Sequence, residues 1–400
     1  MTDKAKMKIA LVCPASLPAT QFGGIMFLCV DIAREIAKAA HDVTIFTTDL
    51  DFANNPHTFN RKLPKLESIQ GFKINRSHVW FWYQLFYINP MMYYEMKGEK
   101  PDIIHAIGIR SFQTLIAALI SKNYKIPLVI SDQGGLTTHP DLAKNSLVKK
   151  TMYKLQNPFI KFIINQSTKI IVPNEYEKEI FATFGAESKV TIVRNGIDVD
   201  ELYQNKIDFK KKYAVGEKFI LFVGRFNKVK GIDILLRAWA LINSNRVTTN
   251  KKLVIMGVDF GFESEMESMI KSLKIADTTI VIKKPPREDV IAAYAACEFL
   301  VLPSRWELSP LTPLEAFAFK KAVVSTNAHG IPHTLEDGKN CILVRPEDDI
   351  ALSEAMIDLL ENEDKRARLG LSGYQLVKDT CNSQEMSKRI AAVYRQIVKT

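Results

Sequence analysis

The sequence predicts an α/β protein of two doubly wound domains, each built on a parallel sheet with helices on both faces. Short, continuous apolar runs alternate with helix-like segments along most of the chain. Strands of this kind are typical of parallel sheets that are buried on both faces. The alternation breaks at Arg194–Asp198, where a polar, lysine-rich stretch follows, and then starts again. A chain of 400 residues is long enough for two domains that each bury their own core.

The N-terminal half is expected to alternate strands and helices from its beginning. Lys8–Cys13 predicts the first strand, and Gly24–Ala40 predicts a helix, because its apolar residues recur at helical spacing on one face. Another helix is expected to begin at Asn174. The other strands expected in this half are Asp42–Thr47, Ile103–Ala106, Pro127–Ser131, Lys169–Pro173 and Val190–Val193. These elements predict an N-terminal domain over residues 1–198.

The C-terminal half is expected to repeat the pattern after a linker at residues 199–216. Its expected strands are Phe219–Val223, Lys252–Met256, Thr279–Ile282, Phe299–Leu302 and Ala322–Ser325. They predict a second domain over residues 217–378. The last segment, 379–400, is expected to hold a helix at about Ser383–Val398 that could pack back on the N-terminal domain.

Composition narrows the class of protein. The formal net charge of +10 suits an anionic ligand or an anionic membrane surface. It is spread over both halves and no nucleic-acid-binding motif accompanies it, so no nucleic-acid partner is expected. No apolar run has the length of a membrane-spanning helix, and the first apolar run is too short for a signal peptide. The five cysteines lack metal-ligand spacing. Reduced thiols, a cytoplasmic location and no metal are therefore expected.

Two acids eight positions apart, Glu307 and Glu315, follow a buried strand of the second domain. One falls on the loop after the strand and the other in the first turns of the next helix. Ligands of open α/β sheets bind beyond the carboxyl ends of the strands. Carboxylates there accept hydrogen bonds from vicinal hydroxyls, which predicts a site for ribose or a sugar. The alternative is a pair of surface acids that stabilise the start of a helix.

A second motif opens the C-terminal domain. Gly224, Arg225 and Lys230 lie on a tight loop that follows the strand Phe219–Val223 and leads into a helix. Two cations on a strand-to-helix loop predict a diphosphate site. The alternative is a solvated basic turn. In the N-terminal domain, Gly23 and Gly24 follow the first strand and open a helix, so their backbone N–H groups could approach a phosphate closely.

Together these motifs resemble the retaining glycosyltransferases of the GT-B fold, in particular glycosyltransferase family 4. The resemblance implies two Rossmann-like domains that face each other across a cleft. It implies that Glu315 holds the ribose of a nucleotide-sugar donor, that Glu307 contacts the transferred sugar, and that Gly224, Arg225 and Lys230 bind the diphosphate. The two cations would also stabilise charge on the departing nucleotide, so that no metal cofactor is needed.

The same resemblance implies that the glycine pair Gly23 and Gly24 faces the far side of the donor diphosphate. This chain has Pro310 where relatives have a glycine after the first acid. Because proline has no N–H, donor contacts at this helix start are expected from Leu311 and Thr312.

The sugar and acceptor side departs from the family pattern. Only the first histidine of a D-x-x-H-x-H stretch remains, as His105, and Gln133 stands where relatives often have a histidine. Asp132, Gln133 and His139 are the other polar candidates for this side. His105 could equally be a hydrogen-bonded core residue.

Two features of the N-terminal domain bear on the acceptor. Trp80–Tyr87 and Met91–Tyr94 are densely aromatic, and the stretch from Leu142 to Asn174 has six lysines and no acid. A basic amphipathic surface suits anionic lipid headgroups. This predicts peripheral contact with the inner face of a membrane and a lipid-linked acceptor. The alternative is core aromatics and a solvated lysine face.

The resulting expectation is a metal-independent retaining glycosyltransferase of the hexosyltransferase type, acting in glycan or cell-envelope biosynthesis. It would transfer a sugar from a nucleotide diphosphate donor, such as a UDP- or GDP-sugar, to a carbohydrate or lipid-linked acceptor. Two alternatives remain. One is a silent relative that binds nucleotide sugar or supports a partner enzyme, and the other is a sugar-nucleotide epimerase of the same fold.

Overall fold

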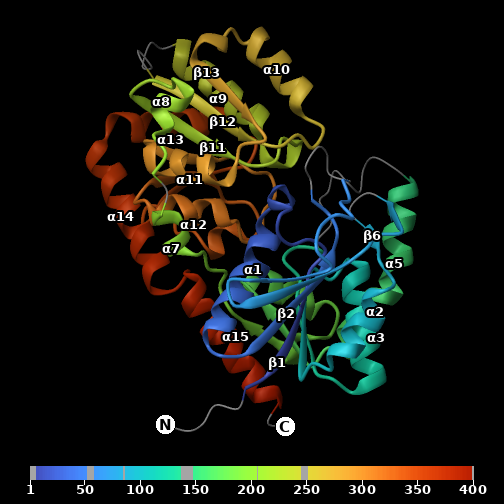
Figure 1. The fold of residues 1–400 in the computed structure, drawn as a ribbon. Helices are drawn as coiled ribbons and strands as arrows, with labels where there is room; N and C mark the ends of the chain where they lie inside the picture. The colour runs from blue at the N-terminus through green and yellow to red at the C-terminus, as the bar shows by residue number, and fades with distance from the viewer. Residues whose placement is uncertain are drawn as a thin grey trace. The chain divides into compact units, whose positions relative to one another are not determined.

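The structure is a computed structural model that describes residues 6–51, 58–83, 86–136, 147–204, 206–244 and 251–398. The chain forms two compact units (Figure 1). Unit 1 comprises Met1–Asn195 and Ser383–Thr400, and unit 2 comprises Gly196–Asn382. Each unit is built on a mainly parallel sheet with helices on both faces, so the predicted fold class is confirmed.

Unit 1 has an eight-stranded sheet in the order β10-β9-β8-β7-β1-β2-β4-β3. Its strands are β1 (Lys8–Val12), β2 (Asp42–Thr48), β3 (Leu66–Ile69), β4 (Phe72–Ser77), β7 (Ile103–Ile107), β8 (Leu128–Ser131), β9 (Lys169–Val172) and β10 (Val190–Ile192). All neighbouring strands are parallel except β3, which pairs antiparallel with β4 at one edge. The central strands β1, β7 and β8 are mostly apolar and almost entirely buried, as is typical of parallel strands covered on both faces.

Two helical layers cover this sheet. The helices are α1 (Gly24–Lys38), α2 (Met92–Glu99), α3 (Phe112–Tyr124), α5 (Leu147–Gln166), α6 (Glu175–Ala182) and α15 (Ser383–Val398), with short 3-10 turns η1 (Thr20–Phe22) and η2 (Glu187–Lys189). Alternate strand residues such as Ala10, Ile104 and Ile130 pack against α2, α3 and α5. On the other face α1 lies alongside α15 (Figure 1). The C-terminal helix is thus part of unit 1.

A separate two-stranded hairpin lies between β4 and α2 in the chain. It pairs β5 (Phe81–Tyr83) with β6 (Phe86–Ile88) antiparallel. All three residues of β5 are exposed. The sequence predicted no strand in this aromatic run. The hairpin is absent from the unit 1 sheet and joins it through α3, against which Phe86 packs.

Unit 2 has a six-stranded, fully parallel sheet in the order β13-β12-β11-β14-β15-β16. Its strands are β11 (Lys218–Val223), β12 (Lys251–Gly257), β13 (Thr279–Lys283), β14 (Phe299–Leu302), β15 (Ala322–Thr326) and β16 (Cys341–Val344). Five of them lie where the sequence predicts them. The sixth, β16, was not predicted because only four residues pair and three of these are half-buried.

The helices of unit 2 cover both faces of its sheet. They are α7 (Val199–Tyr203), α8 (Phe209–Tyr213), α9 (Ile232–Ser244), α10 (Glu263–Ser272), α11 (Arg287–Ala296), α12 (Leu311–Ala318), α13 (Asp349–Glu361) and α14 (Glu363–Asp379), with 3-10 turns η3 (Lys228–Lys230), η4 (Ala276–Thr278) and η5 (Ile331–His333). One core joins α11 and α12 to Leu221, Val254 and Leu300, and the other joins α9 and α13 to the alternate residues of the same strands.

Residues 199–216, which the sequence predicts as a linker, belong to unit 2. They carry α7 and α8, whose side chains Leu202 and Phe209 are buried in the unit 2 core. Both helices are only five residues long, too short to show helical periodicity in the sequence, and the many lysines of α8 gave the stretch a linker-like composition.

In the part of the chain that the structure describes, none of the helices combines the length and the hydropathy that a membrane span requires.

Candidate functional site

The candidate site of unit 2 lies where its strand order reverses. β11 and β14 are neighbours at the centre of the sheet, with β12 and β13 on one side and β15 and β16 on the other. The loops after β11 and β14 therefore leave the same edge of the sheet and diverge. In open α/β folds this switch point is the usual ligand site.

The loop after β11 carries the predicted phosphate-binding residues. Asn227 caps the 3-10 turn by accepting a hydrogen bond from the backbone N–H of Lys230 (3.1 Å). Gly231 follows with a φ of +67°, and a β-carbon there would lie 2.0 Å from the carbonyl oxygen of Pro303. Only glycine fits such a close approach. The loop after β11 is thus packed directly on the end of β14.

Lys230 and Glu307 form an ion pair in which the ammonium group contacts Oε1 of the carboxylate. The hydroxyl of Ser304 also approaches this oxygen (3.3 Å). Both charged side chains retain access to solvent, with exposed fractions of 21% for Lys230 and 14% for Glu307. Lys230 and Glu307 are 77 positions apart in the chain and are predicted to bind neighbouring parts of one ligand. The structure brings them into contact.

Arg225 lies on the same loop. Its guanidinium group stacks over the ring of Phe260, 4.6 Å from the ring centroid. Stacking of this kind restrains a guanidinium while its edge remains a hydrogen-bond donor. The aromatic partner comes from the loop after β12, so neighbouring strands jointly position this cation.

The N-terminus of α12 supplies further donors. Pro310 is its N-cap and provides no side-chain cap, so the first N–H groups of the helix, including those of Leu311 and Thr312, have no intrahelical acceptor. The hydroxyl of Thr312 is buried and has no hydrogen-bond partner within the described part of the chain. A helix start of this kind favours a bound anion.

Glu315 lies one turn inside α12 and is 7% exposed. Its Oε1 accepts a contact from Nη2 of Arg287 at 2.7 Å, and Glu201 lies 3.7 Å from the same guanidinium. Burial alone would lower the pKa of Arg287, but the charges of Glu315 and Glu201 outweigh it and raise that pKa. Glu315 is therefore held beside a permanent cation and is fixed in orientation.

Arg305 is a positioning residue that the sequence did not single out. Its Nη1 and Nη2 bind both carboxylate oxygens of Asp233 at 2.7 Å, and Nη1 also donates to the carbonyl of Lys228 (2.5 Å). Burial would raise the pKa of Asp233, but the hydrogen bonds and charge of Arg305 lower it overall. Arg305 thus fastens the loop after β14 to the loop after β11 and to α9.

Gly330 holds the opposite side of the Glu307 loop. Its N–H donates to the carbonyl of Glu307 (3.0 Å), and a β-carbon at Gly330 would lie 1.9 Å from the carbonyl oxygen of Leu308. Neither Arg305 nor Gly330 could be predicted from the sequence as a residue that positions this loop, because their partners lie far away in the chain.

In unit 1 the glycine pair begins α1. Gly23 is the N-cap, with a φ of +101°, and Gly24 is the first helical residue. The predicted position of both at a strand-to-helix turn agrees with the structure. The N–H of Met26 donates to the carbonyl of Gly23 (3.0 Å), whereas the N–H groups of Gly24 and Ile25 at this helix start have no acceptor within the helix.

His105 lies in the core of unit 1. It is fully buried in β7, and its ring nitrogens contact the hydroxyls of Tyr394 (2.6 Å) and Ser131 (2.8 Å). Burial lowers the pKa of His105 to about 3. The candidate role on the sugar or acceptor side is therefore not supported, since the ring is enclosed and both nitrogens are engaged by side chains of α15 and β8. His139, the other histidine candidate, lies outside the described residues.

Asp132 and Gln133 follow β8 at the carboxyl edge of the unit 1 sheet. Asp132 is buried, and its carboxylate accepts hydrogen bonds from the backbone N–H groups of Ile109 (3.3 Å) and Leu136 (2.7 Å). Gln133 exchanges two amide hydrogen bonds with Asn195 (2.8 and 3.0 Å). Both side chains hold the loops at this edge in place. They would act on a ligand through the shape of these loops, or through the hydrogen-bonding capacity of the Gln133 amide that Asn195 does not use.

Comparison with known proteins assigns the chain to a family. The family profile described as glycosyltransferase family 4 matches residues 22–201, and the profile described as glycosyl transferases group 1 matches residues 203–376. The two matches meet close to the boundary between the units and together span most of the chain. The chain belongs to the GT-B glycosyltransferases of the family 4 type.

Similar proteins agree with this assignment. An uncharacterized glycosyltransferase of Methanocaldococcus jannaschii is 26% identical over 291 residues, which cover 71% of this chain and 72% of that protein. Sucrose-phosphate synthase from Thermosynechococcus elongatus has the same fold, with a TM-score of 0.79, 18% identity and coverage of 98% and 99% of the two chains. The Anabaena protein HepE, solved in complex with UDP-glucose, matches with a TM-score of 0.74, 19% identity and coverage of 98% and 100%.

For this glycosyltransferase, replacing Arg305 with lysine is expected to lower the free energy of unfolding by about 1–2 kcal/mol, because an ammonium cannot reproduce a bidentate pair. The measurement is urea unfolding. Arg237→Lys is the matched control, since Arg237 contacts the same Asp233 from a more exposed position at 3.5 Å. That exposed pair should contribute less than about 0.5 kcal/mol to the free energy of unfolding. Equal losses in the two variants would show that the pairing geometry of Arg305 is unimportant.

A pH dependence is expected from Asp132. Burial raises its pKa to about 6, from an ordinary value of 3.8. A raised carboxyl pKa stabilises the folded state below the ordinary value, and this contribution is lost as the pH rises through 6. Between pH 4 and 7 the loss amounts to at most about 3 kcal/mol. Chemical unfolding at several pH values should show this loss in the wild type and a flatter profile in Asp132→Asn.

Asp102→Asn is the control for this experiment. Asp102 also accepts a backbone hydrogen bond, from Lys8 (2.7 Å), but it is exposed. Its profile should keep the slope of the wild type. The same slope in Asp132→Asn would contradict the assignment of the pH dependence to Asp132.

Proposed function

We propose that this glycosyltransferase transfers a sugar from a nucleoside diphosphate donor to a carbohydrate or lipid-linked acceptor, with retention of anomeric configuration and without a metal ion. The contact between Lys230 and Glu307 carries the proposal. It joins a loop suited to phosphate with a loop suited to sugar hydroxyls at the switch point of a parallel sheet.

In this proposal the donor diphosphate binds between the β11 loop and the start of α12. Arg225 and Lys230 supply positive charge, and the first N–H groups of α12 supply hydrogen bonds. Charge accumulates on the diphosphate as its bond to the sugar breaks. Preorganised cations and N–H groups stabilise that charge more in the transition state than in the ground state, which lowers the barrier.

Glu307 and Glu315 hold the two sugar-like parts of the donor. Glu307, freed from part of its contact with Lys230 when phosphate engages the ammonium, accepts hydrogen bonds from the transferred sugar. Glu315 accepts hydrogen bonds from the ribose while Arg287 fixes its orientation. Fixed carboxylates of this kind set the position of the anomeric carbon relative to the phosphate.

The reaction needs no covalent enzyme intermediate. The bond between the anomeric carbon and the diphosphate oxygen breaks, and the acceptor oxygen bonds to the same face of that carbon. The acceptor proton passes to an oxygen of the departing diphosphate. The products are a nucleoside diphosphate and a glycoside with the anomeric configuration of the donor.

Donor binding is tested by thermal unfolding with UDP-, GDP- and ADP-sugars. A ligand at one hundred times its dissociation constant stabilises the folded state by about 2.7 kcal/mol, so one nucleotide should raise Tm clearly. Glu315→Gln should reduce the shift, because an amide offers one acceptor oxygen in place of two. Glu354→Gln, at an exposed position of α13, should preserve it. A panel without any shift at millimolar concentration would overturn the proposed donor site.

Retention and metal independence have their own readout. The anomeric configuration of the product is assigned by NMR from coupling constants, and turnover is measured in excess EDTA. The expected results are the configuration of the donor and an unchanged rate. An inverted product, or a rate lost in EDTA and restored by Mg²⁺ or Mn²⁺, would contradict the proposal.

The acceptor side of the proposal includes contact with an anionic membrane. Trp80, Phe81, Trp82 and Tyr83 are 43–65% exposed, whereas Tyr87 is buried. Exposed aromatic side chains on a basic protein favour an anionic interface. Sedimentation with vesicles that contain anionic lipid should therefore be strong at low salt and weak at high salt. Failure to bind at low salt would remove the membrane from the proposal.

A further inference from the structure

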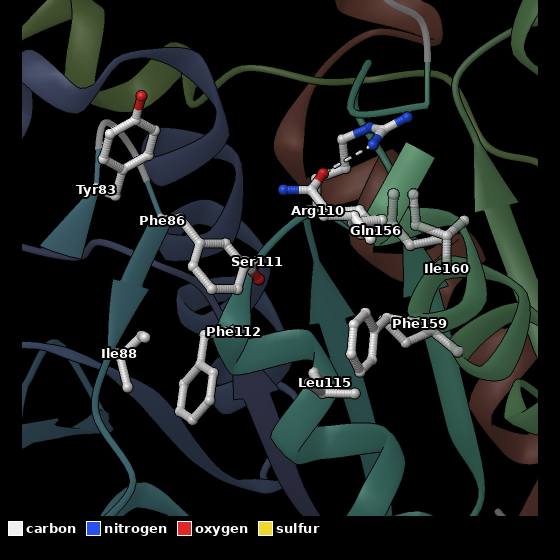
Figure 2. A pocket seen from close by; sticks show the side chains of 13 residues that line it. Tyr83, Phe86, Ile88, Arg110, Ser111, Phe112, Leu115, Gln156, Phe159 and Ile160 are labelled. Carbon is white, nitrogen blue, oxygen red and sulfur yellow. Dashed lines mark hydrogen bonds between the residues drawn. The ribbon is translucent and has the colours of Figure 1, made fainter. Parts of the chain in front are cut away.

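Unit 1 contains a pocket of about 410 Å³ (Figure 2). It opens between the β5–β6 hairpin, α3 and α5, all of which belong to the same unit. Its lining comes from β5, β6, the loop between β7 and α3, the first turn of α3 and the second half of α5. None of the lining residues belongs to the donor site proposed for unit 2.

The pocket wall is almost entirely apolar. Phe86 and Phe112 meet edge to face with ring centroids 6.2 Å apart, and Leu115 lies one turn further along α3. On the α5 side, Leu155 and Phe159 are 66% and 54% exposed. Apolar side chains that remain exposed at a concave site lose contact with water when an apolar ligand enters.

Polar groups gather on one side of the pocket. Arg110 donates from Nη1 to Oε1 of Gln156 (2.9 Å) and from Nε to the carbonyl of Gly135. Figure 2 shows Arg110 and Gln156 close together, away from Phe112 and Leu115. These hydrogen bonds fix a permanent cation at one side of an apolar recess.

We propose that this pocket holds the hydrocarbon chain of a lipid phosphate, with the phosphate beside Arg110. The inference rests on the proposed function in that the lipid phosphate would be the lipid-linked acceptor or its carrier. An amphiphile with one anionic end matches a recess that is apolar apart from one cationic side. Lys144, Lys149, Lys150 and Lys154 of the predicted basic stretch lie outside the described side chains, and among those described Arg110 forms the cationic side of the pocket.

The test uses dodecyl phosphate as a soluble probe, below the concentration at which it forms micelles. Isothermal titration should show binding to the full-length protein, with dodecyl maltoside binding at least tenfold more weakly and inorganic phosphate weaker still. Because the probe is monomeric, binding reports on the pocket and not on a membrane surface. Binding of dodecyl phosphate no tighter than that of inorganic phosphate would overturn the inference.

Variants locate the site. Phe159→Glu and Leu155→Glu place a carboxylate at exposed positions of the wall and should weaken dodecyl phosphate at least tenfold. Leu371→Glu is the matched control, because Leu371 is 56% exposed on α14 of unit 2, and it should bind as the wild type does. Arg110→Gln should remove the preference for dodecyl phosphate over dodecyl maltoside while leaving dodecyl maltoside binding in place. Equal affinity of Phe159→Glu, Leu155→Glu and wild type for dodecyl phosphate would place the probe elsewhere.

The inference and the proposed function fail separately. The nucleotide-sugar Tm shift should be unchanged in Phe159→Glu, which also shows that this variant is folded. A normal donor shift without amphiphile binding would refute the pocket and leave the donor site standing. Amphiphile binding at the pocket without any donor shift would support the pocket and refute the donor site.

Discussion

Replacing Lys230 with alanine is expected to lower kcat/KM for sugar transfer by about 100- to 1000-fold. This is the usual loss when one preorganised donor is removed from a site that stabilises developing negative charge. Lys230 is suited to that role because its position is fixed from two sides. Its backbone N–H is bound by Asn227, and its ammonium contacts Glu307.

The control for this prediction lies two residues away. Lys228 is in the same 3-10 turn, but its side chain is 65% exposed and pairs with Glu265 (3.1 Å). Lys228→Ala changes the net charge by the same amount and should change kcat/KM by less than about threefold, as expected for a surface ion pair. The assay is initial-rate kinetics with the donor found in the thermal panel. Equal losses in Lys228→Ala and Lys230→Ala would mean that general charge, and not the position of Lys230, drives activity.

Replacing Gly231 with alanine is expected to destabilise the protein by more than about 3 kcal/mol. The left-handed backbone at this position costs a non-glycine residue about 1–2 kcal/mol. The new β-carbon would also lie 2.0 Å from the carbonyl oxygen of Pro303, so the β11 loop must separate from the end of β14. The measurement is the free energy of unfolding in urea, and the donor Tm shift should fall together with stability.

Gly338 separates the two contributions. Its φ of +70° matches the +67° of Gly231, but a β-carbon at Gly338 would meet no atom within 4 Å. Gly338→Ala should therefore lose only the backbone contribution of about 1–2 kcal/mol. The difference between the variants measures the cost of the contact with Pro303. Losses of the same size would show that the two loops are not packed as described.

Most sheet strands could be predicted because both faces of a parallel sheet are buried. Phe299–Leu302 is a run of four apolar residues between Glu298 and Pro303, and the structure has a strand of the same bounds. The edge of unit 1 was harder to predict. β3, with the sequence Leu-Glu-Ser-Ile, pairs only with β4, and its residues are exposed or half-buried. A short run of mixed apolar and polar residues of this kind also occurs in many loops.

The candidate site was predicted unevenly for a related reason. Lys230 and Glu307 could be singled out because each lies on a local strand-to-helix pattern that the sequence displays. His105 could not be judged in the same way. Its position on β7 was clear, but its neighbours Ser131 and Tyr394 come from distant segments, and they make it a core residue. Arg287 and Arg305 were missed because nothing near them in the chain indicates their partners.

The sequence by itself determined the alternation of most strands and helices, the resemblance to the family, and the candidate residues for phosphate and sugar. These depend on periodicity, turn residues and short motifs, which act over a few positions of the chain. Tertiary structure alone decided which cations and carboxylates meet, which histidine is enclosed, and that an apolar pocket with one cationic side forms between α3, α5 and the β5–β6 hairpin. Such contacts depend on how strands are ordered in a sheet and on which side chains fill the space between layers. Neither can be predicted from the spacing of residues along the chain.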